Sequence, residues 1–596
     1  MKMKTTPSNL CTSTAQALGC AALSVLLLIS CDERAQSSSP ALFEDVTAPA
    51  GLEIPLTSGG DPLNKSSILE VNGNGAALVD LDNDGDLDVI LVDGSTHERI
   101  LAGDPVHHHV LLNQGVEDGI PRFTPATETG LVMNGWPTGV VSGDVDRDGR
   151  PDLVIGGHGE DALFLNRTEI DGPLHFEKHT LPGRTGPLDW TTSLSMADAD
   201  NDGQLDLYLV RYLDIDPKDL PTNVLGDVPC LFEGHPVLCG PHGMTAQADV
   251  FLRGLHNGPP WFEVATEPAG LASVPPSYGL GILFMDLDID GDVDLYVAND
   301  SVDNFLFRND GTGHFEELGA LSGAVSDASG RPQAGMGVDA ADWDQDGDLD
   351  LVVTNFSDES NTLYRNEGEL HFRDVSTGIG LTAASRPLLG WGVHMRDFNA
   401  DGLTDLFFSN GHVYPQADQP DTSSSYAQPL VLLLGEPGGR LGSNVFPDLR
   451  THRGRGALVG DVDNDGDLDL LVLRLDDSPR LFLNGTNASE RQMVVTLEGD
   501  ARSGPDAYGA TFTLETSAGK RVAQKTAATG FQSHGDTRLY LTLPPDEKIL
   551  SASVLWPGGN LEQLELDSNR LRAGQSLVVR QGSGIISSSP LRNRAR

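Results

Sequence analysis

A nine-residue acidic motif occurs seven times in this chain and constrains the fold more than any other feature. Each copy reads D-x-D-x-D-G-x-x-D, except that asparagine replaces the second aspartate in the sixth copy. The side chains that offer oxygen are Asp80, Asp82, Asp84 and Asp88; Asp144, Asp146, Asp148 and Asp152; Asp198, Asp200, Asp202 and Asp206; Asp286, Asp288, Asp290 and Asp294; Asp342, Asp344, Asp346 and Asp350; Asp397, Asn399, Asp401 and Asp405; and Asp461, Asp463, Asp465 and Asp469.

Clustered oxygen ligands of this kind favour Ca²⁺, because that ion accepts about six to eight oxygens in flexible geometry. Mg²⁺ demands a stricter octahedron, and transition metals prefer the imidazole or thiolate ligands that these motifs lack. The glycine at the sixth position permits a sharp turn around a cation. An EF-hand is excluded, because the position where it needs glutamate is apolar in every copy. We therefore predict up to seven calcium sites, with calcium acting to hold the fold together.

The apolar runs after each motif predict short buried strands. The first aspartates lie 54 to 88 residues apart, a period that suits a four-stranded propeller blade and a variable loop. A strand that begins with phenylalanine follows every motif except the seventh, and its equivalent, FEDVTAPAGL, precedes the first motif at residues 43–52. Such a strand can complete the last blade and leave no open edge. We predict an all-β chain with one seven-bladed β-propeller over residues 41–488.

These motifs resemble the FG-GAP/VCBS repeats of integrin-α-type propellers. CLFEGHPVLCGPHG (230–243), VANDSVDNFLFRNDG (297–311) and NGHVYPQAD (410–418) are similar to segments in bacterial relatives of cartilage acidic protein 1. The segments AYGATFTLETSAGK and VLWPGGNLEQLEL resemble the ASPIC/UnbV domain of that family, although Ser533-His534 and 541–545 depart from its usual pattern. Alternating apolar residues predict a small β-sandwich-like domain over 489–580. We expect residues 581–596 to form a disordered basic tail.

The N-terminal segment predicts export. Lys2 and Lys4 precede an apolar run too short to span a bilayer, so residues 1–30 are interpreted as a signal peptide. The sequence LISC resembles a bacterial lipobox, which implies cleavage before Cys31 and lipidation of its thiol. An ordinary secretory signal is the alternative. Residues 31–40 then form a polar tether, and the expected location is the periplasm or the cell surface, with membrane contact only through a lipid anchor.

Charge and the remaining cysteines fit an exported protein. The formal net charge of -48 argues against a nucleic-acid partner, since phosphate contacts need lysine and arginine patches. Cys230 and Cys239 are the two cysteines outside the N-terminal segment, and we predict that they form a disulfide. Two unrelated thiols are the alternative.

Polar residues near the far ends of the strands that follow the motifs are candidates for a ligand-binding rim. They are Asp93, His158, Arg211, Tyr212, Asn299, Asp300, Asn355, Asn410, His412 and Arg474. The main interpretation is a binding or adhesion-type module for a protein or a glycan. Two alternatives stay open: a structural or assembly factor, and an enzyme with a site in the propeller channel. No hydrolase, metalloprotease or nucleotide-binding motif is present in the sequence.

Overall fold

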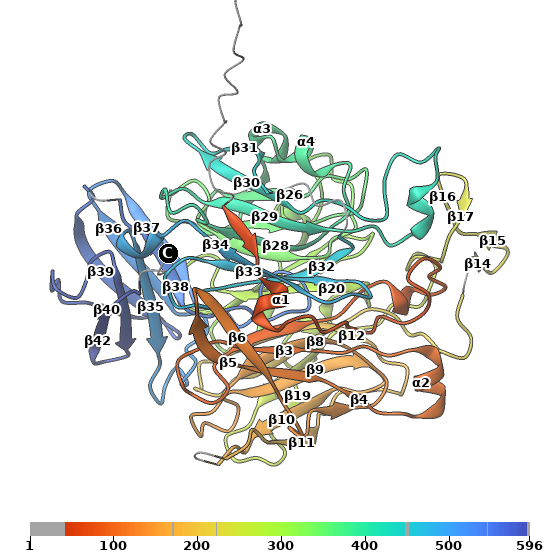
Figure 1. Ribbon diagram of the computed structural model, residues 1–596, viewed down its shortest axis with the longest axis horizontal. Coiled ribbons are helices and arrows are strands. Elements are labelled where there is room, and N and C mark those ends of the chain that lie inside the picture. Colours follow the sequence, from red (N-terminus) through yellow and green to blue (C-terminus); the bar gives the residue numbers. More distant parts are fainter. Residues whose placement is uncertain (1–41, 170–171, 222, 447–451, 545, 593–596) are drawn as a thin grey trace, which may run out of the picture. The chain divides into compact units, whose positions relative to one another are not determined.

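The computed structural model describes residues 42–169, 172–221, 223–446, 452–544 and 546–592 (Figure 1). The predicted signal peptide, Cys31 and the tether lie outside these residues. Within the described part, no helix is long and apolar enough to pass through a bilayer. The helices are short: α1 (Thr47–Ala50), α2 (His97–Ala102), α3 (Ser376–Ile379), α4 (Leu381–Ser385), and the 3-10 turns η1 (Ile68–Glu70), η2 (Leu271–Ser273), η3 (Gly319–Leu321), η4 (Pro415–Asp418) and η5 (Ala488–Glu490).

Seven antiparallel sheets of four strands each make up the larger part of the described chain. They are β2 (Ala76–Val79), β3 (Asp88–Leu91), β5 (His109–Glu117) and β6 (Ile120–Ala126); β8 (Trp136–Gly143), β9 (Asp152–His158), β10 (Ala162–Asn166) and β11 (Phe176–Thr180); β12 (Thr191–Ala197), β13 (Asp206–Arg211), β18 (Val250–Gly254) and β19 (Phe262–Val264); β20 (Gly279–Met285), β21 (Asp294–Asn299), β22 (Phe305–Asn309) and β23 (Phe315–Glu317); β24 (Val338–Ala341), β25 (Asp350–Val353), β26 (Thr362–Asn366) and β27 (Phe372–Asp374); β28 (Gly390–Arg396), β29 (Asp405–Asn410), β30 (Val431–Glu436) and β31 (Arg440–Asn444); and β32 (Gly454–Gly460), β33 (Asp469–Arg474), β34 (Arg480–Asn484) and β1 (Phe43–Asp45).

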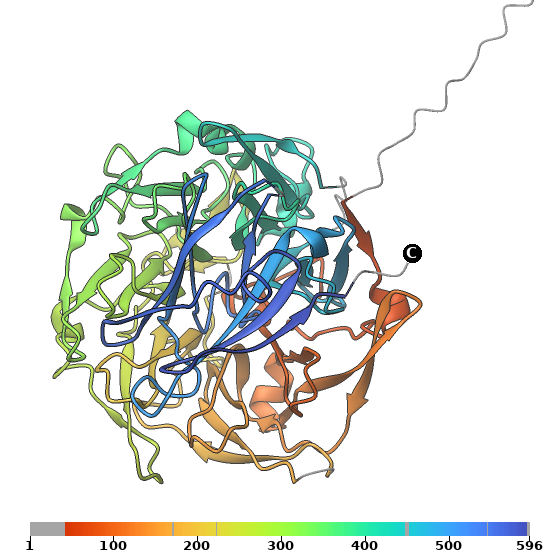
Figure 2. The same ribbon diagram turned by 90° about the vertical axis from the view of Figure 1, so that its left-hand side faces the viewer.

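The first strands of these sheets contact one another in a closed cycle. β2 contacts β8, β8 contacts β12, and the contacts continue through β20, β24, β28 and β32 back to β2. Figure 2 shows the sheets arranged around this cycle, with the C-terminal strands in front. The prediction of an all-β propeller is therefore confirmed.

The N-terminal strand completes the last sheet. This was predicted from the segment at 43–52, which begins with phenylalanine and precedes the first motif. β1 pairs antiparallel with β34, and Phe43 lies opposite Asn484. Because β1 supplies the outer strand of a sheet whose other strands come from the end of the propeller, the two ends of the ring are joined by backbone hydrogen bonds.

The cores lie between neighbouring sheets, which explains why the strands are apolar on both faces. Along β9, Leu153 and Ile155 pack into a cluster shared with the first sheet, whereas Val154 packs into a cluster shared with the third. Successive side chains of a strand point to opposite faces, so a strand stacked on both sides must be apolar throughout. The continuous apolar runs after the motifs follow from this packing.

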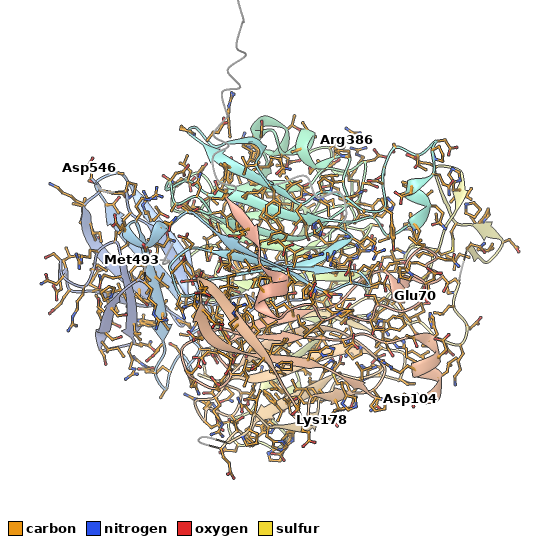
Figure 3. All side chains as sticks on the ribbon, viewed as in Figure 1. Glu70, Asp104, Lys178, Arg386, Met493 and Asp546 are labelled. Atoms are coloured by element: carbon orange, nitrogen blue, oxygen red, sulfur yellow. A yellow bond between two sulfur atoms is a disulfide. The ribbon has the colours of Figure 1, made fainter. Side chains whose placement is uncertain are left out.

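Two further four-stranded sheets form the C-terminal domain. One contains β38 (Leu539–Thr542), β35 (Gln492–Glu498), β41 (Gln575–Arg580) and β42 (Gly584–Pro590), and the other contains β37 (Lys520–Gln524), β36 (Thr511–Thr516), β39 (Ile549–Trp556) and β40 (Asn560–Gln563). The sheets enclose a common apolar cluster that includes Met493, labelled in Figure 3, together with Phe512 and Trp556. The arrangement matches the predicted β-sandwich.

The predicted disordered tail over 581–596 is wrong for residues 584–590. These residues form β42, which pairs with β41 and places Ile585 against the sandwich core. The basic residues and the run of serines suggested a solvated tail, but a glycine-containing turn at Gly582 folds the chain back onto β41. Backbone pairing with a neighbouring strand needs few apolar side chains, so this strand left little signal in the sequence.

The remaining short strands lie in insertions between propeller strands. β4 (Val106–His107) pairs with β7 (Val132–Met133), and two small hairpins follow β13: β14 (Val224–Leu225) with β15 (Val228–Pro229), and β16 (Leu231–Phe232) with β17 (His235–Pro236). Cys230 and Cys239 form a disulfide at the second hairpin, with their Cα atoms 5.2 Å apart. The predicted pairing of these two cysteines is confirmed.

Candidate metal centres in the propeller loops

Every acidic motif forms the turn between the first two strands of a propeller sheet. In the first sheet, β2 ends at Val79 and β3 begins at Asp88, so the motif occupies the whole turn. The closing aspartate is the first residue of the second strand in each sheet, namely Asp88, Asp152, Asp206, Asp294, Asp350, Asp405 and Asp469. A hairpin turn holds each motif, as expected from the exclusion of an EF-hand.

The first aspartate of a motif organises the backbone of its own turn. In the first loop, Asp80 accepts hydrogen bonds from the N–H groups of Asp84 at 3.0 Å and Gly85 at 2.9 Å. The chain turns there through positive φ angles of 59° at Asn83 and 93° at Gly85. The glycine position has φ between 85° and 102° in all seven loops, at Gly85, Gly149, Gly203, Gly291, Gly347, Gly402 and Gly466. A side chain would be strained in this region, which explains the repeated glycine.

The closing aspartate joins the turn to the third strand, a role that the sequence analysis did not identify. Asp88 accepts from the N–H of Leu81 at 3.0 Å through one oxygen and from the N–H of Asn113 on β5 at 2.8 Å through the other. Equivalent pairs of bonds occur in the other six sheets. Each carboxylate oxygen has a second lone pair, so these bonds leave acceptor capacity for a cation.

Carboxylate oxygens from different motif positions converge in the turns. In five of the loops, three aspartates each place an oxygen within 4.8 Å of the other two. The trios are Asp80, Asp82 and Asp88; Asp144, Asp146 and Asp152; Asp198, Asp200 and Asp206; Asp286, Asp288 and Asp290; and Asp342, Asp344 and Asp350. The remaining predicted aspartates of the third position turn one oxygen toward the backbone, as Asp84 does to the N–H of Asp86 at 2.9 Å.

The sixth loop differs in its second ligand. Asn399 donates its amide hydrogen to Asp401 at 2.9 Å and accepts from the backbone N–H of Asp401 at 3.0 Å. Asp397 nevertheless accepts from Asp401 and Gly402 as the first aspartate does elsewhere. The seventh loop repeats the same backbone bonds, from Asp465 and Gly466 to Asp461. The turn conformation is thus common to all seven loops.

Several motif oxygens are buried and have no hydrogen-bond donor among the described residues. One oxygen of each of five aspartates is in this position: Asp146, Asp200, Asp288, Asp342 and Asp344. A buried acceptor without a partner carries a substantial cost, so such atoms call for a ligand. Carboxylate oxygens are hard donors, and their convergence within a turn fits a hard cation. The donor set therefore fits a metal ion of the calcium type.

The same burial raises the proton affinity of the motif carboxylates. Desolvation, reinforced by neighbouring aspartates, raises the pKa of Asp80, Asp144, Asp288 and Asp397 to about 6, of Asp198 and Asp342 to about 7, and of Asp88, Asp152, Asp286, Asp350 and Asp405 to about 8. The pKa values of Asp206, Asp294, Asp461 and Asp469 are also raised, by burial above all. Such a cluster needs either protons or a cation to offset its mutual repulsion.

Comparison with known families accounts for both parts of the chain. The FG-GAP-like repeat family matches residues 80–155, 144–209, 286–353 and 342–408, and the ASPIC and UnbV family matches residues 499–586. The chain is an FG-GAP repeat protein with an ASPIC/UnbV domain. The FG-GAP matches begin at motif aspartates, and the ASPIC/UnbV match covers most of the β-sandwich.

Curated relatives are similar to this chain over most of its length, and some solved structures are similar to part of it. Cartilage acidic protein 1 of Xenopus tropicalis is 24% identical over 507 residues, covering 82% of this chain and 70% of that protein. The Homo sapiens protein of the same name is 24% identical over 520 residues, covering 84% and 71%. An Agrocybe aegerita lectin is 15% identical with a TM-score of 0.36, covering 63% of this chain and 88% of the lectin. A Bacillus licheniformis rhamnogalacturonan lyase is 12% identical with a TM-score of 0.36, covering 73% and 75%.

The ASPIC/UnbV domain lies on the face of the FG-GAP propeller that carries the acidic loops. Asp506 accepts from the N–H of Asp144 at 2.8 Å, and Gln524 both accepts from and donates to the backbone of Asp286. Further bonds reach three other loops, from Lys520 to the carbonyl of Gly347, from Arg521 to that of Gly402, and from Arg538 to that of Asp461. Five of the seven loops are thus hydrogen-bonded directly to the ASPIC/UnbV domain.

A segment of the ASPIC/UnbV domain also enters the propeller along the cycle of first strands. Gly530 exchanges two backbone hydrogen bonds with Val338 of β24, and His534 bonds to the backbone on either side of Ala77 in β2. Between them, Phe531 is fully buried, with its ring centroid 4.9 Å from that of Trp391. This segment therefore packs against the first strands from the side of the ASPIC/UnbV domain.

The ten candidate rim residues lie inside the protein instead of on an open surface. Asp300 is half-buried, and the other nine, namely Asp93, His158, Arg211, Tyr212, Asn299, Asn355, Asn410, His412 and Arg474, are buried. Some of their polar groups bond within the chain, as Arg211 does to Asp161 at 3.0 Å and Tyr212 to Asp300 at 2.7 Å. Other atoms, such as Oδ1 of Asn299 and of Asn410, are buried without a hydrogen-bond partner among the described residues. These residues are therefore covered in this structure, and a role for them in ligand binding stays a prediction.

The candidate rim residues are buried because the insertions after β13 and β29 fold over the ends of the strands. An apolar cluster that includes Trp136, Trp190 and Leu238 covers the strand ends on this side, and Phe232 of the disulfide hairpin packs on His412 with ring centroids 4.7 Å apart. Position along a strand could be deduced from the sequence, but the segment that folds over it could not. Tryptophan residues at the start of first strands, such as Trp136 in β8, were the available signal that this end is packed.

Proposed function

We propose that this protein is an exported, calcium-stabilised propeller that acts as a binding module of the cell envelope. The observation that supports calcium most directly is the set of buried motif oxygens without a donor, such as those of Asp146 and Asp288. The FG-GAP repeats and the ASPIC/UnbV domain are consistent with a binding module. The predicted signal peptide and lipobox at Cys31 support export and lipid anchoring.

In four of the loops the first, second and closing aspartates would hold the ion, and in the fourth loop the trio is Asp286, Asp288 and Asp290. Other motif oxygens or a backbone carbonyl would complete the shell. Bound calcium supplies two positive charges per site and so neutralises the clustered carboxylates. The chain itself does the rest: the first aspartate shapes the turn, and the closing aspartate ties that turn to the third strand. Calcium therefore has a structural role in this proposal, and ligand recognition lies elsewhere on the surface.

Removal of calcium from the purified mature protein tests the metal assignment. We expect EDTA to lower the melting temperature strongly, because each site contributes about 2.7 kcal/mol when free calcium is about a hundredfold above its Kd. Calcium titrated back should restore the melting temperature and give saturable heat by calorimetry, whereas Mg²⁺ at equal concentration should restore little. An unchanged melting temperature in EDTA would refute the assignment.

Lipidation and binding need separate measurements. Mass spectrometry of the envelope-extracted protein should find an acylated N-terminal Cys31, and a Cys31→Ala variant should be released as a soluble protein. The immobilised protein should capture the same envelope component repeatedly in calcium and release it in EDTA. If no component is captured, the binding-module proposal fails and the structural or assembly role is left.

A further inference from the structure

Two small hairpins, β14–β15 and β16–β17, project from the molecule at the end opposite the ASPIC/UnbV domain. Figure 1 shows them at the right of the ribbon, with the C-terminal strands at the left. Each is closed by a two-residue turn with glycine, and in the second turn Glu233 and Gly234 have positive φ angles of 47° and 89°. Turns of this kind match the natural twist of paired strands.

Isolated hairpins of this size are marginal in water, yet these are anchored to the propeller. The Cys230–Cys239 disulfide closes the second hairpin. Beneath it, Phe232 packs on His412 and Tyr414 with ring centroids 4.7 and 5.5 Å away. The backbone of Ser423 donates to Glu233 at 2.7 Å, which joins the hairpin to the insertion after β29. The hairpins are thus held in one conformation before any partner arrives.

The outer surface of the hairpins is apolar, although nothing in the described chain covers it. The hairpin tip, which we define as Val224, Val228, Pro229, Leu231 and Pro236, is exposed throughout. Val228 is 68% exposed and Leu231 is 55% exposed. Strand register places Val224 beside Pro229 in the first hairpin and Leu231 beside Pro236 in the second, so each hairpin carries a pair of exposed apolar residues. Single exposed apolar residues are common, but exposed pairs on two successive hairpins indicate a contact surface.

The two insertions that form and contact the hairpins are acidic. Residues 214–243 and 414–425 contain seven aspartate or glutamate residues but one basic residue, Lys218. The exposed members nearest the tip in sequence are Asp227 and Glu233. This charge favours a positively charged partner and disfavours a second copy of this chain, whose net charge is -48.

We propose that the hairpin tip is the docking surface for a basic, apolar segment of a partner protein. The inference rests on the proposed function as a binding module and assigns that function to one site and one class of ligand. Valine, leucine and proline side chains would cover the apolar face of the segment, and the acidic side chains of the two insertions would pair with its lysine or arginine residues. Because the tip is already ordered, binding loses little conformational entropy on this side.

A synthetic peptide of alternating lysine and valine is a suitable probe, since an extended chain of this pattern has one cationic and one apolar face. Its binding to the full mature protein is followed by fluorescence anisotropy in calcium. We expect the double variant Val228→Ser with Leu231→Ser to bind at least about tenfold more weakly. Leu321→Ser, which removes a leucine that is 88% exposed on another part of the propeller, is the matched control and should bind as the wild type does.

Two further peptides separate the contribution of charge to binding from the contribution of apolar contact. A glutamate–valine peptide should not bind, and a lysine–serine peptide should bind at least about tenfold more weakly than lysine–valine. Equal binding by the hairpin variant and the wild type, equal binding of the lysine–serine peptide, or no binding of lysine–valine at all would overturn the proposal. The calcium-dependent rise in melting temperature is measured on every variant. If that rise is present while peptide binding fails, the docking proposal falls but the calcium propeller does not.

Discussion

Replacing Asp152, the closing aspartate of the second loop, by asparagine tests two properties of this residue separately. These are its hydrogen bonds to the backbone and its binding of a metal ion. Asp152 accepts from the N–H of Val145 at 2.9 Å through one oxygen and from the N–H of Asn166 at 2.8 Å through the other. An asparagine side chain of the same shape has one acceptor oxygen, so Asp152→Asn must leave one buried N–H facing an amide nitrogen. That loss is about 1–3 kcal/mol, independent of calcium.

Bound calcium should increase the loss of stability that Asp152→Asn causes. If Asp152 is a ligand, the variant also loses a charged oxygen, and a tenfold weaker site adds about 1.4 kcal/mol whenever calcium is present. Hydrogen exchange of the peptide that contains Asn166 measures the local opening free energy directly. In EDTA, we expect hydrogen exchange in the variant to be about 5 to 150 times faster than in the wild type. In calcium, we expect this ratio of variant rate to wild-type rate to be at least about tenfold larger than it is in EDTA.

The control is Asp104→Asn, which changes an exposed aspartate beside β4 (Figure 3) and should leave exchange near Asn166 unaltered. An effect of Asp152→Asn that is equal with and without calcium would show that this carboxylate is not a ligand. No effect under either condition would refute the reasoning from the two backbone bonds.

Three other substitutions test the contact between the propeller and the ASPIC/UnbV domain. Phe531→Ala should destabilise by about 3–5 kcal/mol and speed proteolysis of the domain. Gly291→Ala should loosen domain and loop together, because a Cβ would lie 2.4 Å from backbone of the domain, and calorimetry should find weaker calcium binding. Burial lowers the pKa of His534, which lies near Asp536 and Lys525, to about 4. The unfolded state therefore binds more protons between about pH 6.5 and 4, so acidification should lower the wild-type melting temperature more than that of His534→Asn.

The sequence alone determined the features that depend on short stretches of chain. The aspartates and the glycine that shape each turn lie within nine residues, and the structure places every motif on a turn between two strands. Strands stacked on both faces must be apolar throughout, and β9 shows both faces buried. The displaced strand at Phe43 predicted closure of the ring, because an unpaired sheet edge is a liability that proteins avoid.

Only the tertiary structure decided what covers each end of the propeller. His534 pairs with β2, 457 residues away along the chain from Ala77, and no local pattern encodes such a contact. The burial of Arg211 and the pairing of β42 were not foreseen for the same reason: burial and pairing depend on a segment that arrives from elsewhere in the chain. Local hydrogen bonding and the convergence of carboxylate oxygens are encoded in short stretches of chain, whereas the docking of one surface on another is a property of the whole folded chain.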